Sequence, residues 1–182
     1  MRRKLVFLFV GVFFVLISNA QITKATLQAS GLTCALCAKA VYTNLASLSF
    51  VESVDTDLNA SAFLIIFKKN ASVDFDELSK KVQDAGFSVA SLKFTIKLNN
   101  LKVGNDVHET IESNVYQFVN VKSQTLDGEV ILKIVDKDFV SAKEYKKFSG
   151  TTKMECMKTG RTAACCLTAG IKENTRIFHV TI

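Results

Sequence analysis

The apolar positions of residues 22–92 follow two different periods along the chain. Alternation of apolar and polar residues predicts strands, and recurrence of apolar residues at every third or fourth position predicts helices. The expected elements, in chain order, are a strand at 24–30, a helix at 37–48, strands at 51–58 and 62–68, a helix at 74–85 and a strand at 88–92. This βαββαβ order predicts the α+β class, with two helices on one face of an antiparallel sheet.

Local signals mark the ends of the two helices. Thr33 is expected to cap the first helix, because its side-chain oxygen can accept a hydrogen bond from a free backbone N–H of the first turn. Asp74, with Glu77 three residues later, has the spacing of a capping box at the start of the second helix. Gly86 is expected to end that helix.

Residues 93–182 are predicted to be a second, degenerate copy of the same unit. A displacement of 68 positions aligns residues 57–67 with residues 125–135. Upstream of that alignment, an apolar stripe like that of the first helix predicts another helix, which contains Ile111, Val115 and Phe118. We therefore predict a tandem repeat.

The second copy departs from the first in two places. Val103 and Asp106 lie near the positions that correspond to the cysteine pair Cys34 and Cys37 of the first copy, so the pair is absent there. A cysteine-containing insertion at 151–174 precedes a closing strand at 176–182. The predicted domains are accordingly 22–92 and 93–182, with the insertion in the second.

The first twenty residues predict a secretory signal peptide. Three basic residues are followed by an apolar run of 13 residues and then by small residues before a cleavage point after Ala20. That run is shorter than the roughly 20 residues that cross a bilayer as a helix. We therefore expect residues 1–20 to be removed, the mature chain to have no stable membrane insertion, and the protein to be periplasmic or secreted.

Charge and motifs narrow the classes of function. The formal net charge of +6 falls to +3 when Arg2, Arg3 and Lys4 leave with the signal. Basic residues do not gather with aromatic residues in a stripe, which argues against a nucleic-acid partner. The sequence has no nucleophile elbow, phosphate-binding loop or carboxylate pair of recognisable spacing, so we predict that the protein is not an enzyme.

Cysteine usage points to soft-metal chemistry at Cys34 and Cys37. Two cysteines three residues apart at a helix start place their Cβ atoms roughly 5 to 6 Å apart, so both sulfurs can bind one ion. The positive end of the helix dipole favours thiolate over thiol. Cu(I) is the first candidate, because thiolates select it and it accepts few ligands, whereas Zn(II) would need two further ligands.

The residues around this pair resemble the heavy-metal-associated domain, which copper chaperones, amino-terminal domains of P-type ATPases and the periplasmic mercury-binding protein share. The landmarks that agree are Gly31-Leu-Thr-Cys-Ala-Leu-Cys37, Val51, Val54, Leu58-Asn59 and Asp84-Ala-Gly-Phe87. The resemblance implies a ferredoxin-like fold and two-cysteine binding of Cu(I), with Hg(II) and Zn(II) as alternatives. It also implies transfer by ligand exchange to a metal-transporting or metal-accepting protein. Leu32 replaces the usual methionine of the motif.

Other roles for the pair remain open. A structural disulfide between Cys34 and Cys37 would close only a four-residue ring and would constrain the unfolded chain little. A thiol-disulfide redox protein also uses two cysteines at this spacing, but thioredoxin-like enzymes place a cis-proline beside them and this chain has no proline. A disulfide-stapled interaction module without metal is the third alternative.

The insertion gathers more soft ligands. Cys156, Cys165 and Cys166 lie near Met154 and Met157, and these side chains suit either a second Cu(I) site or a disulfide of Cys156 with one of the other two cysteines. The methionines can instead fill gaps in the core. His108 and His179 have no metal-spaced partner nearby in the sequence and are expected to be ordinary surface or strand residues, although His179 can approach the Cys156 loop.

Overall fold

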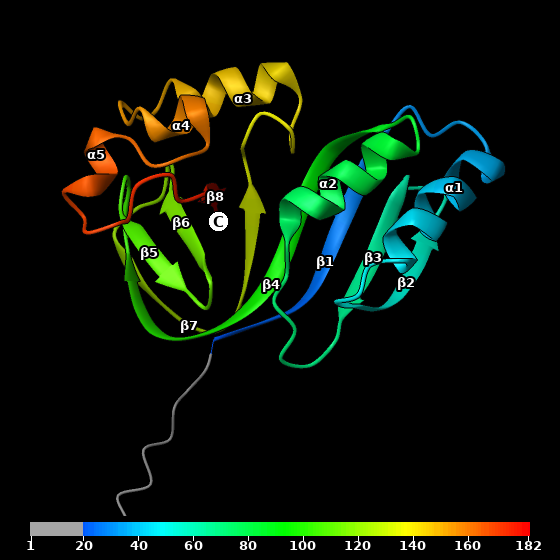
Figure 1. The fold of residues 1–182 in the computed structure, drawn as a ribbon, viewed down its shortest axis with the longest axis horizontal. Helices are drawn as coiled ribbons and strands as arrows, with labels where there is room; N and C mark the ends of the chain where they lie inside the picture. Colours follow the sequence, from blue (N-terminus) through cyan, green and yellow to red (C-terminus); the bar gives the residue numbers. More distant parts are fainter. Residues whose placement is uncertain (1–19) are drawn as a thin grey trace, which may run out of the picture.

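The computed structural model describes residues 20–182, so the predicted signal peptide lies outside the described residues apart from Ala20. Eight strands form one sheet in the order β2-β3-β1-β4-β7-β8-β6-β5 (Figure 1). The elements are β1 (Gln21–Ser30), α1 (Ala35–Ala46), β2 (Val51–Asp57), β3 (Ala62–Phe67), α2 (Phe75–Asp84), β4 (Ser88–Val103), β5 (His108–Ile111), β6 (Asn114–Phe118), β7 (Gln124–Ile134), α3 (Ala142–Ser149), α4 (Cys156–Thr159), α5 (Ala164–Leu167) and β8 (Ile177–Thr181). Among the helices of this described part, none has the length and apolar character that a membrane span requires.

The first half of the chain has the predicted βαββαβ order, and the α+β class is confirmed. Strands β2, β3, β1 and β4 are antiparallel neighbours, and α1 and α2 lie on one face of them (Figure 1). The apolar stripe of each helix is buried, as is the inner side of β3. The residues that show this burial are Val41, Leu45, Phe63, Ile65, Phe75, Leu78 and Val82.

The start and end of α2 follow the local signals. Asp74 is the N-cap, and its carboxylate accepts a hydrogen bond of 3.0 Å from the backbone N–H of Glu77. Gly86 follows the helix at a φ of +86°, a conformation that glycine adopts without a steric penalty. The chain then turns into β4.

A single long strand, β4, joins the two halves of the sheet. Its 16 residues pair with β1 along one edge and with β7 along the other. Leu92, for example, lies opposite Leu27 of β1 and Ile134 of β7. The predicted boundary between residues 92 and 93 therefore falls inside a strand.

The helix predicted around residues 111–118 is wrong. This segment is a hairpin of β5 and β6 with a two-residue turn, in which Glu112 has a φ of +55° and Ile111 pairs with Asn114. The strand β6 is buried on both faces, because Tyr116 and Phe118 belong to the main core while Val115 packs against the C-terminal segment. Burial on both faces removes the alternation that normally identifies a strand.

The tandem repeat is not confirmed by this topology. A second βαββαβ unit would place a helix where β5 and β6 lie, and it would place a turn within residues 125–129. Residues 124–134 instead form one strand, β7, which passes Gly128 at a φ of +73° opposite Leu98. The weak internal similarity therefore does not correspond to a repeated fold.

The closing strand predicted at 176–182 is confirmed as β8. It pairs with β6 in the parallel direction and with β7 in the antiparallel direction. Phe178 and Val180 join the main core, where Phe178 contacts Phe75 of α2. Ile177 belongs to a second cluster that includes Cys156, so successive residues of β8 face opposite sides of the sheet.

Helices α3, α4 and α5 pack on the opposite side of the sheet from α1 and α2. Phe148 of α3 packs against Val119 and Val135, and α4 and α5 contribute Cys156 and Cys166 to the cluster around Val115. Figure 1 shows these three helices at the end of the molecule far from α1. The two groups of cysteines therefore lie in different parts of the structure.

Candidate metal centre

The loop between β1 and α1 brings Cys34 to the first turn of the helix. Gly31 leaves β1 at a φ of +80°, and Cys34 is the N-cap residue, with extended backbone angles. Its sulfur accepts a hydrogen bond of 3.1 Å from the backbone N–H of Cys37. The cap is therefore Cys34, and the expectation that Thr33 fills this position is wrong because Thr33 lies one residue too early.

The two sulfurs of this pair meet at one point. Cys34 and Cys37 are joined by a disulfide, with their Cα atoms 5.3 Å apart. Cys34 is exposed and Cys37 is half-buried, so Cys34 is the more accessible of the two sulfurs. A metal can bind here only after reduction, because the disulfide has no thiolate. Ligation by the reduced pair stays a prediction.

The electrostatic setting of the pair suits anionic sulfur. The first turn of α1 contains no acidic residue. Free backbone N–H groups and the positive end of the helix dipole therefore act on both sulfurs without a competing carboxylate in that turn. Reduction would leave two thiolate-forming side chains at this helix terminus.

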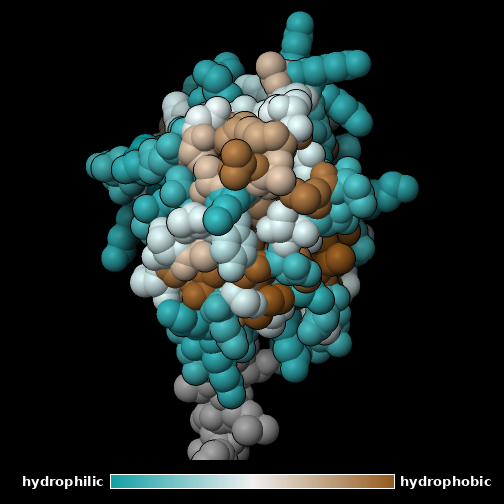
Figure 2. All heavy atoms as spheres, turned by 90° about the vertical axis from the view of Figure 1, so that its right-hand side faces the viewer, coloured by the Kyte–Doolittle hydropathy of each residue, from teal (hydrophilic) through white to brown (hydrophobic). Residues whose placement is uncertain are grey.

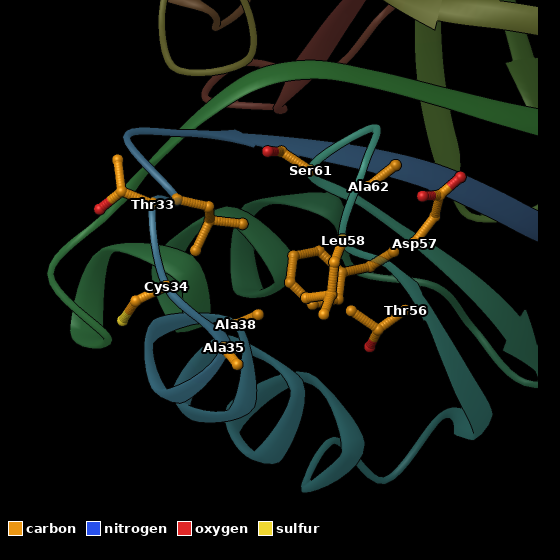
Figure 3. Close-up of a pocket in the computed structure, with 11 residues that line it drawn as sticks. Thr33, Cys34, Ala35, Ala38, Thr56, Asp57, Leu58, Ser61 and Ala62 are labelled. Atoms are coloured by element: carbon orange, nitrogen blue, oxygen red, sulfur yellow. The ribbon is translucent and has the colours of Figure 1, made fainter.

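A cavity of about 150 Å³ lies beside the pair. Figure 3 shows Cys34 at the edge of this cavity at the start of α1, with Leu58 of the turn between β2 and β3 across from it. Leu32 lines the cavity and packs against the main core. This packing fits a residue that supports the loop and does not bind the metal.

A protein-family model matches residues 26–88, which extend from β1 to the first residue of β4 and include both cysteines. This family is the heavy-metal-associated domain. The resemblance predicted for residues 22–92 is thereby confirmed.

Individual relatives match part of the chain. Over 64 residues it is 33% identical to a probable copper-exporting P-type ATPase of Archaeoglobus fulgidus, a match that covers 35% of this chain and 8% of the ATPase. The yeast copper transporter domain, solved in the apo and Cu(I)-loaded states, is 24% identical, with a TM-score of 0.33, over 37% of this chain and 90% of that domain. A putative copper-ion-binding protein from Bacillus anthracis str. Ames is 22% identical, with a TM-score of 0.33, over 39% of this chain and 96% of that one.

The three remaining cysteines form a separate cluster with an imidazole. Cys156, Cys165 and Cys166 are free thiols, and Cys165 Sγ lies 3.8 Å from Cys156 Sγ and 3.5 Å from Cys166 Sγ. His108 Nε2 lies 3.7 Å from Cys156 Sγ and 3.5 Å from Cys166 Sγ. His108 is a strand residue, as one expectation had it, and the β5–β6 hairpin brings it to the sulfurs, a proximity that the sequence does not indicate.

The cluster has a distinct pattern of acidity. Burial raises the pKa of the Cys156 thiol well above its ordinary value, with contributions from hydrogen bonding and charge at Cys166 and Cys165. Burial also raises the pKa of Cys166. At Cys165 burial acts in the same direction, but hydrogen bonds from the backbone of Cys156 and from both neighbouring thiols outweigh it and lower the pKa. Cys165 is therefore the first of the three to become a thiolate.

The other soft or basic side chains have different surroundings. Met157 packs with Val119, Val135 and Phe148, as expected for a gap-filling methionine. His179 is fully buried, and its Nδ1 lies 2.5 Å from Asp136 Oδ1. In the pairing of β8 with β6, His179 lies opposite Gln117. The Oε1 atom of Gln117 accepts a hydrogen bond of 3.0 Å from the Cys156 thiol. The spacing of these residues in the sequence could not reveal that they lie together, because the pairing of β6 with β8 brings them together.

Proposed function

We propose that this protein is an exported, non-enzymatic metal-binding protein that holds one Cu(I)-type ion between the thiolates of Cys34 and Cys37. It passes the ion by ligand exchange to a metal-transporting or metal-accepting protein. The observation that carries this proposal is the cysteine pair at the first turn of α1 inside the segment that matches the heavy-metal-associated domain.

Reduction precedes binding in this proposal. A dithiol donor reduces the Cys34–Cys37 disulfide, itself becoming a disulfide, and both cysteines become thiols. The incoming ion displaces the thiol protons. Two metal–sulfur bonds of about 2.3 Å hold an ion in near-linear geometry when the sulfurs are about 4.5 Å apart, a separation open to two side chains on one helical turn.

Transfer begins at the exposed sulfur. A thiolate of the acceptor binds the ion first as a third ligand, Cys34 dissociates, and a second acceptor thiolate then replaces Cys37. The half-buried position of Cys37 supports this order, because an acceptor reaches Cys34 more easily. Each step exchanges one metal–sulfur bond for another, so the process needs no external energy source.

Exposed apolar residues beside the pair support a protein acceptor. Leu36 is 80% exposed and Leu58 is 58% exposed, and they lie in the first turn of α1 and in the turn after β2. Figure 2 shows apolar side chains grouped on this side of the molecule and surrounded by polar ones. An exposed apolar group with a polar margin is typical of a protein-binding surface.

Titration with Cu(I) tests the proposal. Anaerobic, reduced protein is titrated against a competing chelator, and we expect one tight equivalent that is lost in Cys34→Ser and in Cys37→Ser. The matched control, Cys165→Ser with Cys166→Ser, retains both cysteines of the pair and should retain this equivalent. Loss of the equivalent in the control alone would overturn the assignment to Cys34 and Cys37.

A thiol-disulfide exchange function is the second candidate. The disulfide at the start of a helix with Cys34 exposed favours it. Turnover of a dithiol substrate by metal-free protein, abolished by Cys34→Ser, would support exchange over metal transfer.

A further inference from the structure

Three sulfurs and one nitrogen lie close together on the side of the sheet opposite α1 and α2. They come from three segments: His108 from β5, Cys156 from α4, and Cys165 with Cys166 from α5. The ligand atoms of His108, Cys156 and Cys166 all lie within 4.8 Å of one another. Cys165 adds a third sulfur at 3.8 and 3.5 Å from the other two.

We propose that Cys156, Cys165, Cys166 and His108 form a second metal site, a structural site for a tetrahedral divalent ion such as Zn²⁺. It is independent of the ion carried by Cys34 and Cys37.

Four of the six separations between ligand atoms fit a tetrahedral ion. With bonds of about 2.3 Å to sulfur and about 2.0–2.1 Å to nitrogen, tetrahedral angles place two sulfurs about 3.8 Å apart and a sulfur and a nitrogen about 3.5 Å apart. Cys165 Sγ lies 3.8 Å from Cys156 Sγ and 3.5 Å from Cys166 Sγ, and His108 Nε2 lies 3.7 Å from Cys156 Sγ and 3.5 Å from Cys166 Sγ. Cys165 is outside the group whose ligand atoms all lie within 4.8 Å of one another, so its side chain must turn toward the ion to complete the set. A linear two-sulfur site would need a separation of about 4.5 Å, so the cluster favours four-coordinate zinc over two-coordinate Cu(I).

The surroundings of the cluster are those of a closed, structural site. Cys156 and Cys166 are fully buried, and the only other buried hydrophobic residues of their cluster are Val115 and Ile177 among the described residues. Helices α4 and α5 have four residues each, too few to be stable without tertiary support. A metal bound by both helices and by β5 would fix this segment on the sheet, as structural zinc does in small, irregular domains.

A disulfide among the three cysteines explains the arrangement of these four side chains less well than a metal ion does. Bonding of Cys156 to Cys165 would require their sulfurs to approach from 3.8 Å to about 2.05 Å. It would leave the buried Cys166 and the imidazole beside it without a common function. A bond between the adjacent Cys165 and Cys166 is strained. Four ligands around one ion account for all four side chains.

The test uses reduced, purified protein that carries Cys34→Ser and Cys37→Ser, so that the first site contributes nothing. We expect one equivalent of zinc per chain and, with cobalt(II) as the probe metal, the visible absorption of a tetrahedral ion with sulfur-to-cobalt charge transfer. Adding Cys156→Ser and Cys166→Ser should abolish both signals. Adding His108→Asn, a milder change at a half-buried strand residue, should weaken binding at least about 100-fold, because loss of even an outer-shell partner costs about 10- to 100-fold.

Three results would overturn the proposal. Cobalt bound with an octahedral spectrum would exclude the tetrahedral set. Full zinc binding in the Cys156→Ser, Cys166→Ser protein would place the metal elsewhere. A Cys156–Cys165 disulfide, found by mass spectrometry in protein purified without oxygen, would show that these cysteines form a structural disulfide instead of binding a metal. Because Cys34 and Cys37 are already replaced, none of these results bears on the proposed function.

Discussion

The ring of Phe75 contacts that of Phe178 edge to face, with centroids 5.3 Å apart and planes at 80°. Phe75 begins α2 in the segment that matches the heavy-metal-associated domain, whereas Phe178 lies in β8, and both side chains are buried. Beside them Arg176 binds the Asp76 carboxylate through Nε at 2.7 Å and Nη2 at 2.9 Å. The two halves of the chain therefore share a core as well as a strand.

This shared core predicts that both halves unfold together. Phe178→Ala should reduce the free energy of unfolding by about 3–5 kcal/mol, because it removes a buried ring and leaves a cavity. Urea denaturation should remain a single transition, and native-state hydrogen exchange should accelerate in β1 as much as in β7. Faster exchange in β7 with no change in β1 would mean that the halves are independent domains. Ile131→Ala, at a side chain that is 60% exposed on β7, is the control and should change stability by less than about 0.5 kcal/mol.

The cap of α1 predicts a difference between two substitutions of one cysteine. In reduced protein Cys34→Ser should leave stability almost unchanged, because serine also accepts the hydrogen bond from the Cys37 N–H. Cys34→Ala should cost about 1 kcal/mol, because the cap is lost. Thermal unfolding under reducing conditions measures both. Equal stability of the two variants would show that the hydrogen bond contributes nothing.

The ion pair between Asp76 of α2 and Arg176, the residue before β8, predicts a moderate effect on stability. Arg176 also lies 3.0 Å from the buried Asp136, and its own side chain is 25% exposed. Arg176→Ala should cost about 1–2 kcal/mol, less than loss of a fully buried partner because solvent reaches Asp76. Arg161→Ala, which removes an exposed guanidinium that donates hydrogen bonds to Asn174, is the comparison. Denaturant titration should give a smaller change for Arg161→Ala, and the reverse order would contradict this prediction.

The buried phenol of Tyr116 leads us to predict that the free energy of unfolding depends on pH above the neutral range. Burial raises the pKa of its phenol, and its hydroxyl finds no hydrogen-bond partner within the described residues. Because the folded state holds the proton more tightly, the stability that Tyr116 contributes is complete below pH about 10 and falls as the pH rises further. Tyr116→Phe should remove this part of the alkaline decline and be neutral or stabilising by about 1 kcal/mol at pH 7. Unfolding free energies of both proteins between pH 7 and 11 test this, and parallel curves would contradict it.

The exposed leucine in the first turn of α1 predicts a kinetic effect. If an acceptor docks there, Leu36→Gln should slow metal transfer to an acceptor domain about 10-fold or more, while Cu(I) affinity and stability stay unchanged because no charge is added beside the cysteines. Stopped-flow transfer and chelator competition separate the two quantities. Leu64→Gln, at a 40% exposed position of β3 away from the loop, is the control. An equal effect of both substitutions would place the docking surface elsewhere.

The first half of the fold was predictable because each element has one buried side. The stripe of α1, the alternation of β3 and the Asp74 cap each appear directly in the sequence and in the structure. The second half resisted prediction where burial is on both faces, as in β6, or where one continuous strand runs through both halves of the sheet, as in β4. Neither case leaves a periodic signal in the sequence.

The same distinction applies to the sites. Cys34 and Cys37 are neighbours along one helical turn, so their spacing alone brings the sulfurs together. His108 reaches Cys156 only because β5 pairs with β6 and the C-terminal segment folds over that hairpin. A site assembled by strand pairing has no spacing that a sequence can reveal.

The position of β8 between β6 and β7 also affects biosynthesis. The two neighbouring strands leave the ribosome well before β8, β7 by about 40 residues and β6 by about 60, and until β8 arrives their inner edges carry free N–H and C=O groups. Such edges are templates for pairing with another chain. The nascent protein is therefore most prone to aggregation just before its last strand is made, and a premature stop codon near residue 175 would leave it in that condition permanently.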